Sequence, residues 1–300
     1  MDVFEFDYRS FPSLDEDIVL CLGFFDGVHL GHQKIINEAK KLGKKVGVLS
    51  FSNSAYNFLN GSTELLTPTH DKIKLFKELG VDYYFEVEMS DALIKASPED
   101  FLKQLKSLKP SVCVCGADYT FGYQKQGDVD LLSKYFITKV VGYEMFDNEK
   151  ISSRWIFDAL SKGQITLANR LLGRHYSVRG KVVKGLQNGA RLGYPTANLS
   201  LYDSYFMPRE GVYFGIARLY DEEYNAIASF GTHPTVDELD APILEVFLLD
   251  FNEDIYGERM EFEFIDFHRE NYKFESEFEL SDELYRDRLA AKDFFNKKVD

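Results

Sequence analysis

The chain has 300 residues, of which 45% are hydrophobic and 15% aromatic, enough to form the cores of two ordinary domains and too apolar for a disordered protein. Its formal net charge of −14 argues against a general nucleic-acid-binding protein, because such proteins neutralise phosphates with basic surfaces. No apolar stretch reaches the roughly 18 residues of a membrane span, and the acidic N-terminus lacks a secretion signal, so we expect a cytoplasmic protein without nucleic-acid or membrane partners.

Strand-like and helix-like stretches alternate through the first half of the chain. The helix-like stretches begin near residues 33, 70, 98 and 128, and the apolar strand-like runs lie at 17–22, 45–51, 81–87, 111–115 and 137–144. This alternation predicts an α/β domain with a doubly wound parallel sheet and helices on both of its faces. Such sheets bind ligands at the carboxyl ends of their strands.

The three cysteines, Cys21, Cys113 and Cys115, all fall in these strand-like runs. Their number is odd and their spacing does not match a zinc site. We therefore expect them to be core residues rather than metal ligands or disulfide partners.

The sequence GFFDGVHLGH, residues 23–32, joins the strand-like run 17–22 to the first helix. A helix N-terminus offers unpaired N–H groups and the positive end of the helix dipole, which both favour phosphate. The glycines let the backbone approach a ligand, and His29 and His32 lie on one side of the first turn. Two imidazoles placed there can stabilise charge that develops on a phosphate. The alternatives are a capping turn or a zinc site, although no third ligand lies nearby.

The pattern changes after about residue 145. Two helix-like segments, SSRWIFDALSKG and ITLANRLLG, precede short alternating runs separated by turn signals. These runs predict an antiparallel barrel or sandwich, followed by a last helix from about residue 280 to 296. We place the boundary at Gly173, which gives domains 1–173 and 174–300.

A second candidate site lies in GKVVKGLQNGARLGYPTANL, which is rich in glycine but is not a Walker A loop. Thr196 and Asn198 are two residues apart, so their oxygens face one side of an extended segment and suit Mg²⁺. A hairpin with tight turns is the structural alternative. Glu245 stands alone in the apolar run ILEVFLLDF, either as a solvent-facing residue or as an acceptor for a substrate hydroxyl proton.

Several longer strings carry a family resemblance. They are GFFDGVHLGHQKII, LTPTHDKIKLFKELGVDYYF, CGADYTFGYQKQGD, ISS at 151–153, the string from Gly173 to Leu199, PREGVYFG, LEVFLLDF and KFES at 273–276. HLGH resembles the HxGH motif of nucleotidyltransferases, and the whole set resembles the bacterial bifunctional riboflavin kinase/FMN adenylyltransferases. The resemblance implies a nucleotidyltransferase domain that makes FAD and pyrophosphate from FMN and ATP. It also implies a β-barrel kinase domain with a C-terminal helix that makes FMN from riboflavin, ATP and Mg²⁺.

The resemblance also implies roles for individual residues. In the first domain, His29 and His32 would act on the ATP phosphates, and Asp118 would line the nucleotide or flavin pocket. The remaining nucleotide-binding residues there would be Gly23, Phe24, Asp26, Gly27, Gly31, Ser152, Ser153 and Arg154. In the second domain, Glu245 would be the base, Arg269 would line the flavin pocket, and Thr196 and Asn198 would hold the metal. ATP would also contact Gly185, Gly193, Tyr194 and Pro195.

The chain departs from the family pattern where phosphate-binding cations are expected. ISSTRIR reads ISSRWIF at 151–157, FEPHP reads FSNSA at 51–55, and the basic residue of the DFRFG motif is Thr120. Arg154 either replaces a lost cation from a shifted position or is an exposed helix-start arginine. Two alternatives stay open: a riboflavin kinase with an impaired or restricted adenylyltransferase domain, and a flavin-binding regulator without turnover. The oligomeric state does not follow from the sequence.

Overall fold

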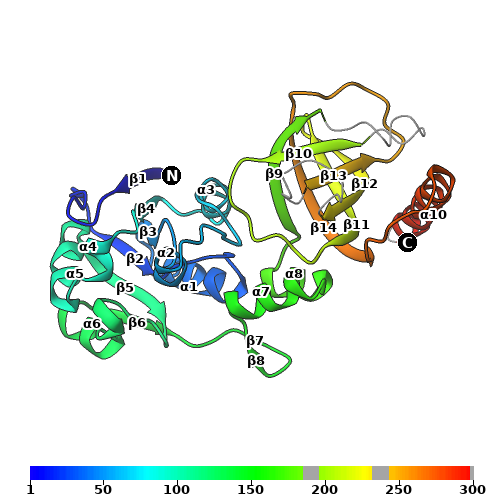
Figure 1. Ribbon diagram of the computed structural model, residues 1–300. Helices are drawn as coiled ribbons and strands as arrows, with labels where there is room; N and C mark the ends of the chain where they lie inside the picture. The colour runs from blue at the N-terminus through cyan, green and yellow to red at the C-terminus, as the bar shows by residue number, and fades with distance from the viewer. Residues whose placement is uncertain (185–195, 232–242, 298–300) are drawn as a thin grey trace. The chain divides into compact units, whose positions relative to one another are not determined.

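The computed structural model describes residues 1–184, 196–231 and 243–297 (Figure 1). The chain divides into two compact units, Met1–Ser153 and Arg154–Asp300. The boundary between the units lies earlier in the chain than the boundary predicted at Gly173. The reason is that helix α8 (Ile165–Leu172) packs on strands of the second unit. Gly173 itself ends α8 in the left-handed conformation, with φ 71°.

The first unit contains a sheet of six parallel strands in the order β1-β4-β3-β2-β5-β6, which confirms the predicted doubly wound fold. The strands are β1 (Asp2–Phe6), β2 (Ile18–Leu22), β3 (Val46–Phe51), β4 (Tyr83–Val87), β5 (Pro110–Gly116) and β6 (Thr138–Val141). β2 and β4 are buried at every position, which explains the unbroken apolar sequence of β2 and the largely apolar sequence of β4, where Glu86 is the exception.

The strand order reverses at β2. The chain leaves β2 through helix α1 (Leu30–Lys40) toward β3, while β5 lies on the other side of β2. Ligand crevices in doubly wound sheets form at such a switch point, outside the carboxyl ends of the strands. The turn 23–29 follows β2 and Asp118 follows β5, so the topology brings two predicted site segments to one edge of the sheet.

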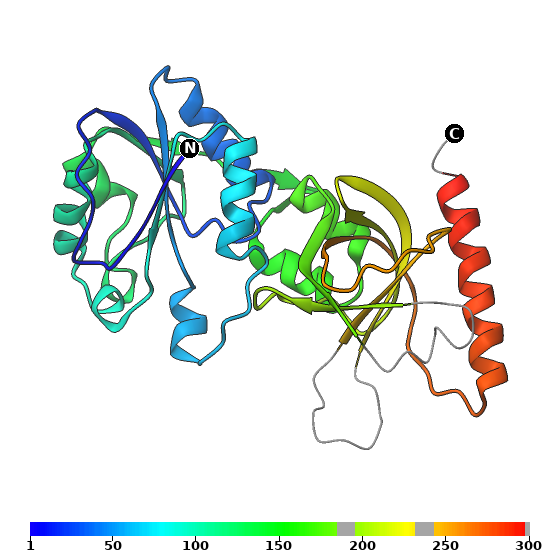
Figure 2. The ribbon, with the colours of Figure 1, turned by 90° about the horizontal axis from the view of Figure 1, so that it is seen from above.

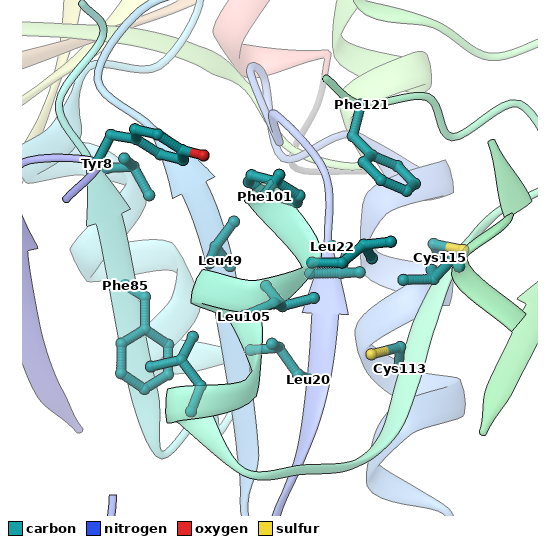
Figure 3. Packing of buried hydrophobic residues seen from close by; sticks show 14 of the residues in the cluster. Tyr8, Leu20, Leu22, Leu49, Phe85, Phe101, Leu105, Cys113, Cys115 and Phe121 are labelled. Carbon is teal, nitrogen blue, oxygen red and sulfur yellow. The ribbon is translucent and has the colours of Figure 1, made fainter. Parts of the chain in front are cut away.

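Helices cover both faces of this sheet. The helices of this unit are α1, α2 (Ala55–Leu59), α3 (Thr69–Glu78), α4 (Asp91–Ile94), α5 (Pro98–Leu105) and α6 (Val129–Tyr135), with 3-10 turns at Lys106–Leu108 and Tyr123–Lys125. α2 has no buried residue. On one face, Phe101 and Leu105 of α5 pack against β2 and β5, as Figure 3 shows. On the other, Ile36 of α1 and Phe76 of α3 fill a second cluster. Each such side chain contributes about 1.5–3 kcal/mol to stability.

Three strands of the first unit were not predicted. β1 pairs in parallel with β4 at the sheet edge, with Asp2 opposite Tyr83. β7 (Met145–Phe146) and β8 (Glu149–Lys150) form a short hairpin, and its turn residues Asp147 and Asn148 have positive φ angles.

The second unit is a closed antiparallel barrel in the order β10-β13-β12-β11-β14-β9, so the barrel prediction is confirmed over the sandwich. Its strands are β9 (Tyr176–Val183), β10 (Ala197–Leu201), β11 (Gly211–Leu219), β12 (Glu222–Gly231), β13 (Ile243–Leu248) and β14 (Arg259–Arg269). Two helices precede it, α7 (Ser153–Ser161) and α8. The predicted last helix is α10 (Glu277–Asn296), which lies beside the barrel in Figure 2.

Side chains alternate between the inside and the outside of the barrel. Leu244, Val246 and Leu248 of β13 point inward and are buried. The outer face carries Phe214 and the cluster that packs against Ala291 and Phe295 of α10. None of the helices in the described parts of the chain has the length and apolar character needed to cross a membrane.

Candidate active sites

The turn between β2 and α1 has an unusual backbone. Phe25, Gly27 and Val28 have φ angles of 55°, 86° and 41°, a region that is costly for a β-branched residue such as Val28. The side chains of Phe25 and Val28 are fully buried, so packing holds the chain in this conformation. Retained strain of this kind is typical of functional turns.

The structure brings His29 and His32 into direct ring contact. His29 is the N-cap of α1, and its Nδ1 accepts a hydrogen bond from the backbone N–H of His32 at 3.3 Å. The two rings stack with centroids 3.6 Å apart and planes 17° apart. An accepting Nδ1 places the imidazole proton of His29 on Nε2. A Cβ atom at Gly31 would lie 3.1 Å from the His29 ring, so Gly31 makes room for this stack.

Asp26 is turned into the protein. Its carboxylate accepts hydrogen bonds from the backbone N–H groups of Leu66, at 3.3 Å, and Thr67, at 2.9 Å. Burial raises the pKa of Asp26 above its ordinary value, although Lys72 and these N–H groups oppose the rise. Asp26 therefore joins the turn to the segment before α3.

The ISS motif and β3 also hold this turn. Ser153 Oγ donates to the carbonyl of Asp26 at 2.7 Å, and Ser50 Oγ donates to the carbonyl of Phe24 at 2.5 Å. Ser152 is partly buried beside Ser153. A Cβ atom at Gly23 would come within 3.0 Å of the Phe25 ring, which explains the glycine there. Sequence motifs far apart in the chain thus converge on one turn.

Arg154 lies on the first turn of α7 and is exposed. Its side chain forms no hydrogen bond or ion pair with any residue that the structure describes. Its geometry is that of an available cation next in the chain to the ISS motif.

Asp118 follows β5 and is largely exposed, with an ion pair to Lys150 of β8. The Lys150 ammonium also lies 4.3 Å from the centre of the Tyr143 ring. On α1, Lys34 pairs with Glu144 at 3.0 Å. Sequence reasoning missed both lysines, although Lys150 directly precedes the ISS motif.

In the second unit, Thr196, Asn198 and Glu245 lie together. Thr196 Oγ1 donates to Glu245 Oε2 at 3.5 Å, and Asn198 of β10 stands opposite Glu245 of β13 in the strand register. Ser229 of β12 is the partner of Glu245 on its other side. Leu199 and Leu244 face inward as a register pair, so the three polar residues belong to the outer face.

These side chains offer a hydroxyl, an amide and a carboxylate, and Mg²⁺ prefers oxygen donors of these kinds. Among the described residues, no group of three or more His, Cys, Asp or Glu side chains converges on a possible metal position. The oxygen set at Thr196, Asn198 and Glu245 fits a magnesium ion that keeps most of its ligands from water and phosphate. Four predicted ATP contacts, Gly185, Gly193, Tyr194 and Pro195, lie outside the described residues.

Arg269, at the end of β14, is bound to α10. Its Nε and Nη2 donate to the two carboxylate oxygens of Asp287 at 2.9 and 2.7 Å, and His268 contacts the same carboxylate at 3.2 Å. Burial alone would raise the pKa of Asp287, but these hydrogen bonds lower it below its ordinary value. Arg269 therefore ties the last barrel strand to the C-terminal helix.

Comparison with known proteins covers both units. A family model described as FAD synthetase matches residues 11–155, and one described as riboflavin kinase matches residues 172–295. A curated relative from Bacillus subtilis (strain 168), named bifunctional riboflavin kinase/FMN adenylyltransferase, is 36% identical over 93% of this chain and 92% of its own length. A relative of the same name from Listeria monocytogenes is 34% identical, with 95% of each chain covered.

One solved structure shares the whole architecture. It is titled a macrolide-efflux protein from Streptococcus pneumoniae, and it matches with a TM-score of 0.89 and 30% identity. The match covers 97% of this chain and 98% of that chain. The similarity therefore includes the parallel sheet, the barrel and the last helix.

Proposed function

Because this chain belongs to the family of bifunctional riboflavin kinase/FMN adenylyltransferases, we propose that its two domains catalyse successive steps of flavin cofactor synthesis. Residues 174–300 phosphorylate riboflavin with ATP to give FMN, and residues 1–173 join FMN to the adenylyl group of a second ATP. The products of the second step are FAD and pyrophosphate. The riboflavin kinase model begins at residue 172, next to this boundary, whereas the FAD synthetase model ends at residue 155, before helix α8.

The observation that carries the kinase assignment is the grouping of Thr196, Asn198 and Glu245. The riboflavin 5′-hydroxyl must lose its proton as it attacks the γ-phosphate of ATP. The Glu245 carboxylate accepts this proton, and its position is set by strand pairing on both sides. Thr196 and Asn198 hold Mg²⁺, which when bound neutralises charge on the phosphates.

In the first domain, the phosphate of FMN attacks the α-phosphorus of ATP and pyrophosphate leaves, so no protein nucleophile is required. Charge accumulates on the phosphate oxygens. The N-terminus of α1 and the Nε2–H of His29 are donors for these oxygens, and His32 stacks against the same ring. Asp118 and Arg269 contribute to flavin binding in their respective domains.

A riboflavin kinase without adenylyl transfer is less well supported, because both family models match the chain. A regulator that only binds flavin would not need a base placed beside metal-binding oxygens. We further propose a cytoplasmic enzyme whose partners are small molecules, since ATP is its co-substrate and its charge of −14 suits neither nucleic acid nor an anionic membrane.

The test uses the purified full chain. Riboflavin, ATP and Mg²⁺ should give FMN by chromatography, and FMN, ATP and Mg²⁺ should give FAD and pyrophosphate in equal amounts. The second assay is run with oxidised and with reduced flavin, and chelation of Mg²⁺ by EDTA should stop both reactions. FMN without FAD in either redox state would favour the kinase-only alternative, and no turnover at all would favour the regulator.

A further inference from the structure

The first unit contains a lysine side chain that is sealed from solvent. Lys72, on the first turn of α3, has a side-chain exposure of 0%. Its Nζ donates to the carbonyl of Phe51 at 3.0 Å and lies 3.8 Å from Glu86 Oε2. Phe51 ends β3 and Glu86 is the penultimate residue of β4, so this cation joins the carboxyl ends of two neighbouring strands.

Burial of an ammonium group is costly, and it lowers the pKa of Lys72 although Glu86 and Asp26 oppose the fall. A core that needed only volume at this position would use methionine or leucine. The presence of a lysine therefore calls for a reason beyond packing.

The anionic partner of Lys72 is itself fixed. Glu86 is 5% exposed, and its carboxylate accepts hydrogen bonds from Thr69 Oγ1, at 2.7 Å, and from the Tyr84 hydroxyl. Thr69 begins α3, one turn before Lys72. The ammonium group is thus held by residues from a helix and two strands and has little room to move.

The same ammonium faces the turn that follows β2. Its Nζ lies 5.0 Å from the centre of the Phe24 ring, a cation–π contact, and it interacts electrostatically with the Asp26 carboxylate. Ser50 holds the carbonyl of Phe24 from the neighbouring strand β3. Lys72 therefore contacts the strand ends of β3 and β4 as well as a side chain of the turn at residues 23–29.

We propose that Lys72 is a positioning residue for adenylyl transfer, an assignment that rests on the function proposed for the first domain. Its charge fixes the Phe24 ring and the Asp26 carboxylate, and through them the backbone of residues 24–28 that leads into His29. The N–H groups at the start of α1 and the two imidazoles are then held in the geometry that the nucleotide phosphates require.

Three variants of the full chain separate this role from simple packing. Lys72→Met removes the charge at similar volume, Lys72→Arg keeps the charge, and Lys72→Met combined with Glu86→Gln removes both members of the ion pair. Lys77→Met, on an exposed position of the same helix, is the matched control. Riboflavin kinase activity of each variant serves as an internal control, because it belongs to the other domain.

We expect Lys72→Met to lower kcat for FAD formation about 100-fold, the effect of a displacement of about 1 Å at a site of this kind. The KM for FMN should stay within threefold, and Lys72→Arg should recover at least a tenth of the wild-type rate. The double variant should regain most of the thermal unfolding temperature lost in Lys72→Met, because neither member of the Lys72–Glu86 pair is left as an unpaired charge, but it should not regain kcat.

Recovery of both stability and kcat in the double variant would overturn the proposal, as would a kcat within threefold of wild type for Lys72→Met. If the wild type makes no FAD, the proposed function fails separately. In that case FAD binding, measured by flavin fluorescence, decides the proposal. A tenfold weaker affinity in Lys72→Met supports a positioning role at this turn, and equal affinity refutes it.

Discussion

The two sites are built in opposite ways. The first rests on a backbone turn with left-handed residues, and its polar side chains hold that turn: Asp26 binds Leu66 and Thr67, and His29 caps α1. The second rests on straight strands whose register sets Asn198 opposite Glu245. In the first site, function therefore depends on many supporting contacts, whereas in the second it is concentrated in a few side chains.

The largest expected effect concerns the second site, where function depends on a few side chains. Glu245→Ala should lower the rate of FMN formation by about 1,000-fold or more, because the riboflavin hydroxyl loses its proton acceptor. FAD formation from added FMN should be unchanged. Glu253→Gln, at an exposed position of the same unit, is the control. Normal FMN turnover in Glu245→Ala would remove Glu245 from the mechanism.

The next effect concerns the first site, where function depends on many supporting contacts. His32→Ala should lower FAD formation about 300-fold, since it removes a charge-stabilising group and the ring on which His29 stacks. The kinase rate should not change. His70→Ala, an exposed histidine on α3, should leave both activities intact. Equal loss in the two histidine variants would point to a folding defect instead.

A third prediction concerns the stability of the second unit, which we expect to depend on the buried ion pair between Arg269 and Asp287. Asp287→Asn should destabilise it by about 3 kcal/mol, because the Arg269 guanidinium loses its bidentate carboxylate partner and keeps the more distant Glu283, at 3.4 Å. Urea unfolding can be followed by the fluorescence of Trp155, the single tryptophan, which lies in this unit. Asp293→Asn, in an exposed pair with Lys297, should cost under about 0.5 kcal/mol.

The effect of Asp287→Asn on stability should also depend on pH. Since the folded pKa of Asp287 is lowered, its contribution is complete above the unfolded value of about 4 and is lost as the pH falls through the folded pKa. The stability difference between wild type and Asp287→Asn should therefore shrink as the pH falls below about 4. A difference that stays undiminished down to about pH 2 would contradict the assignment.

The smallest effect concerns the exposed arginine beside the ISS motif. Arg154→Ala should reduce FAD formation about fivefold, because the pyrophosphate leaving group loses one cation. Arg154→Lys should keep most of the rate, and kinase activity should not respond. Unchanged FAD synthesis in Arg154→Ala would show that this arginine is only a surface residue.

Sequence reasoning succeeded where local pattern determines structure. Apolar runs predicted the buried parallel strands β2 and β4, and alternation predicted the barrel strands. β1 was missed because DVFEF looks like an acidic terminus, and its pairing partner β4 lies about eighty residues away. Its existence depends on an edge left open by the rest of the sheet.

The supporting residues of the first site escaped sequence reasoning for a related reason. Asp26 looks like a ligand-facing acid until Leu66 and Thr67, forty residues later, are placed beside it. Lys72 looks like a surface residue of an amphipathic helix, and only the strand ends around it make it a buried one. Strand period puts Thr196 and Asn198 on one face, but the choice of Glu245 came from the family resemblance, because no local pattern shows that β13 pairs with β10.

The three cysteines can report how often the first unit opens. All are buried and unbridged in β2 and β5 of the first unit, and burial raises the pKa of Cys113 to about 12 and of Cys115 to about 11. The thiolates that alkylating reagents attack are therefore scarce until the sheet opens. The second unit contains no cysteine. The rate of thiol labelling therefore reports the frequency with which the first unit alone opens, and no probe has to be engineered.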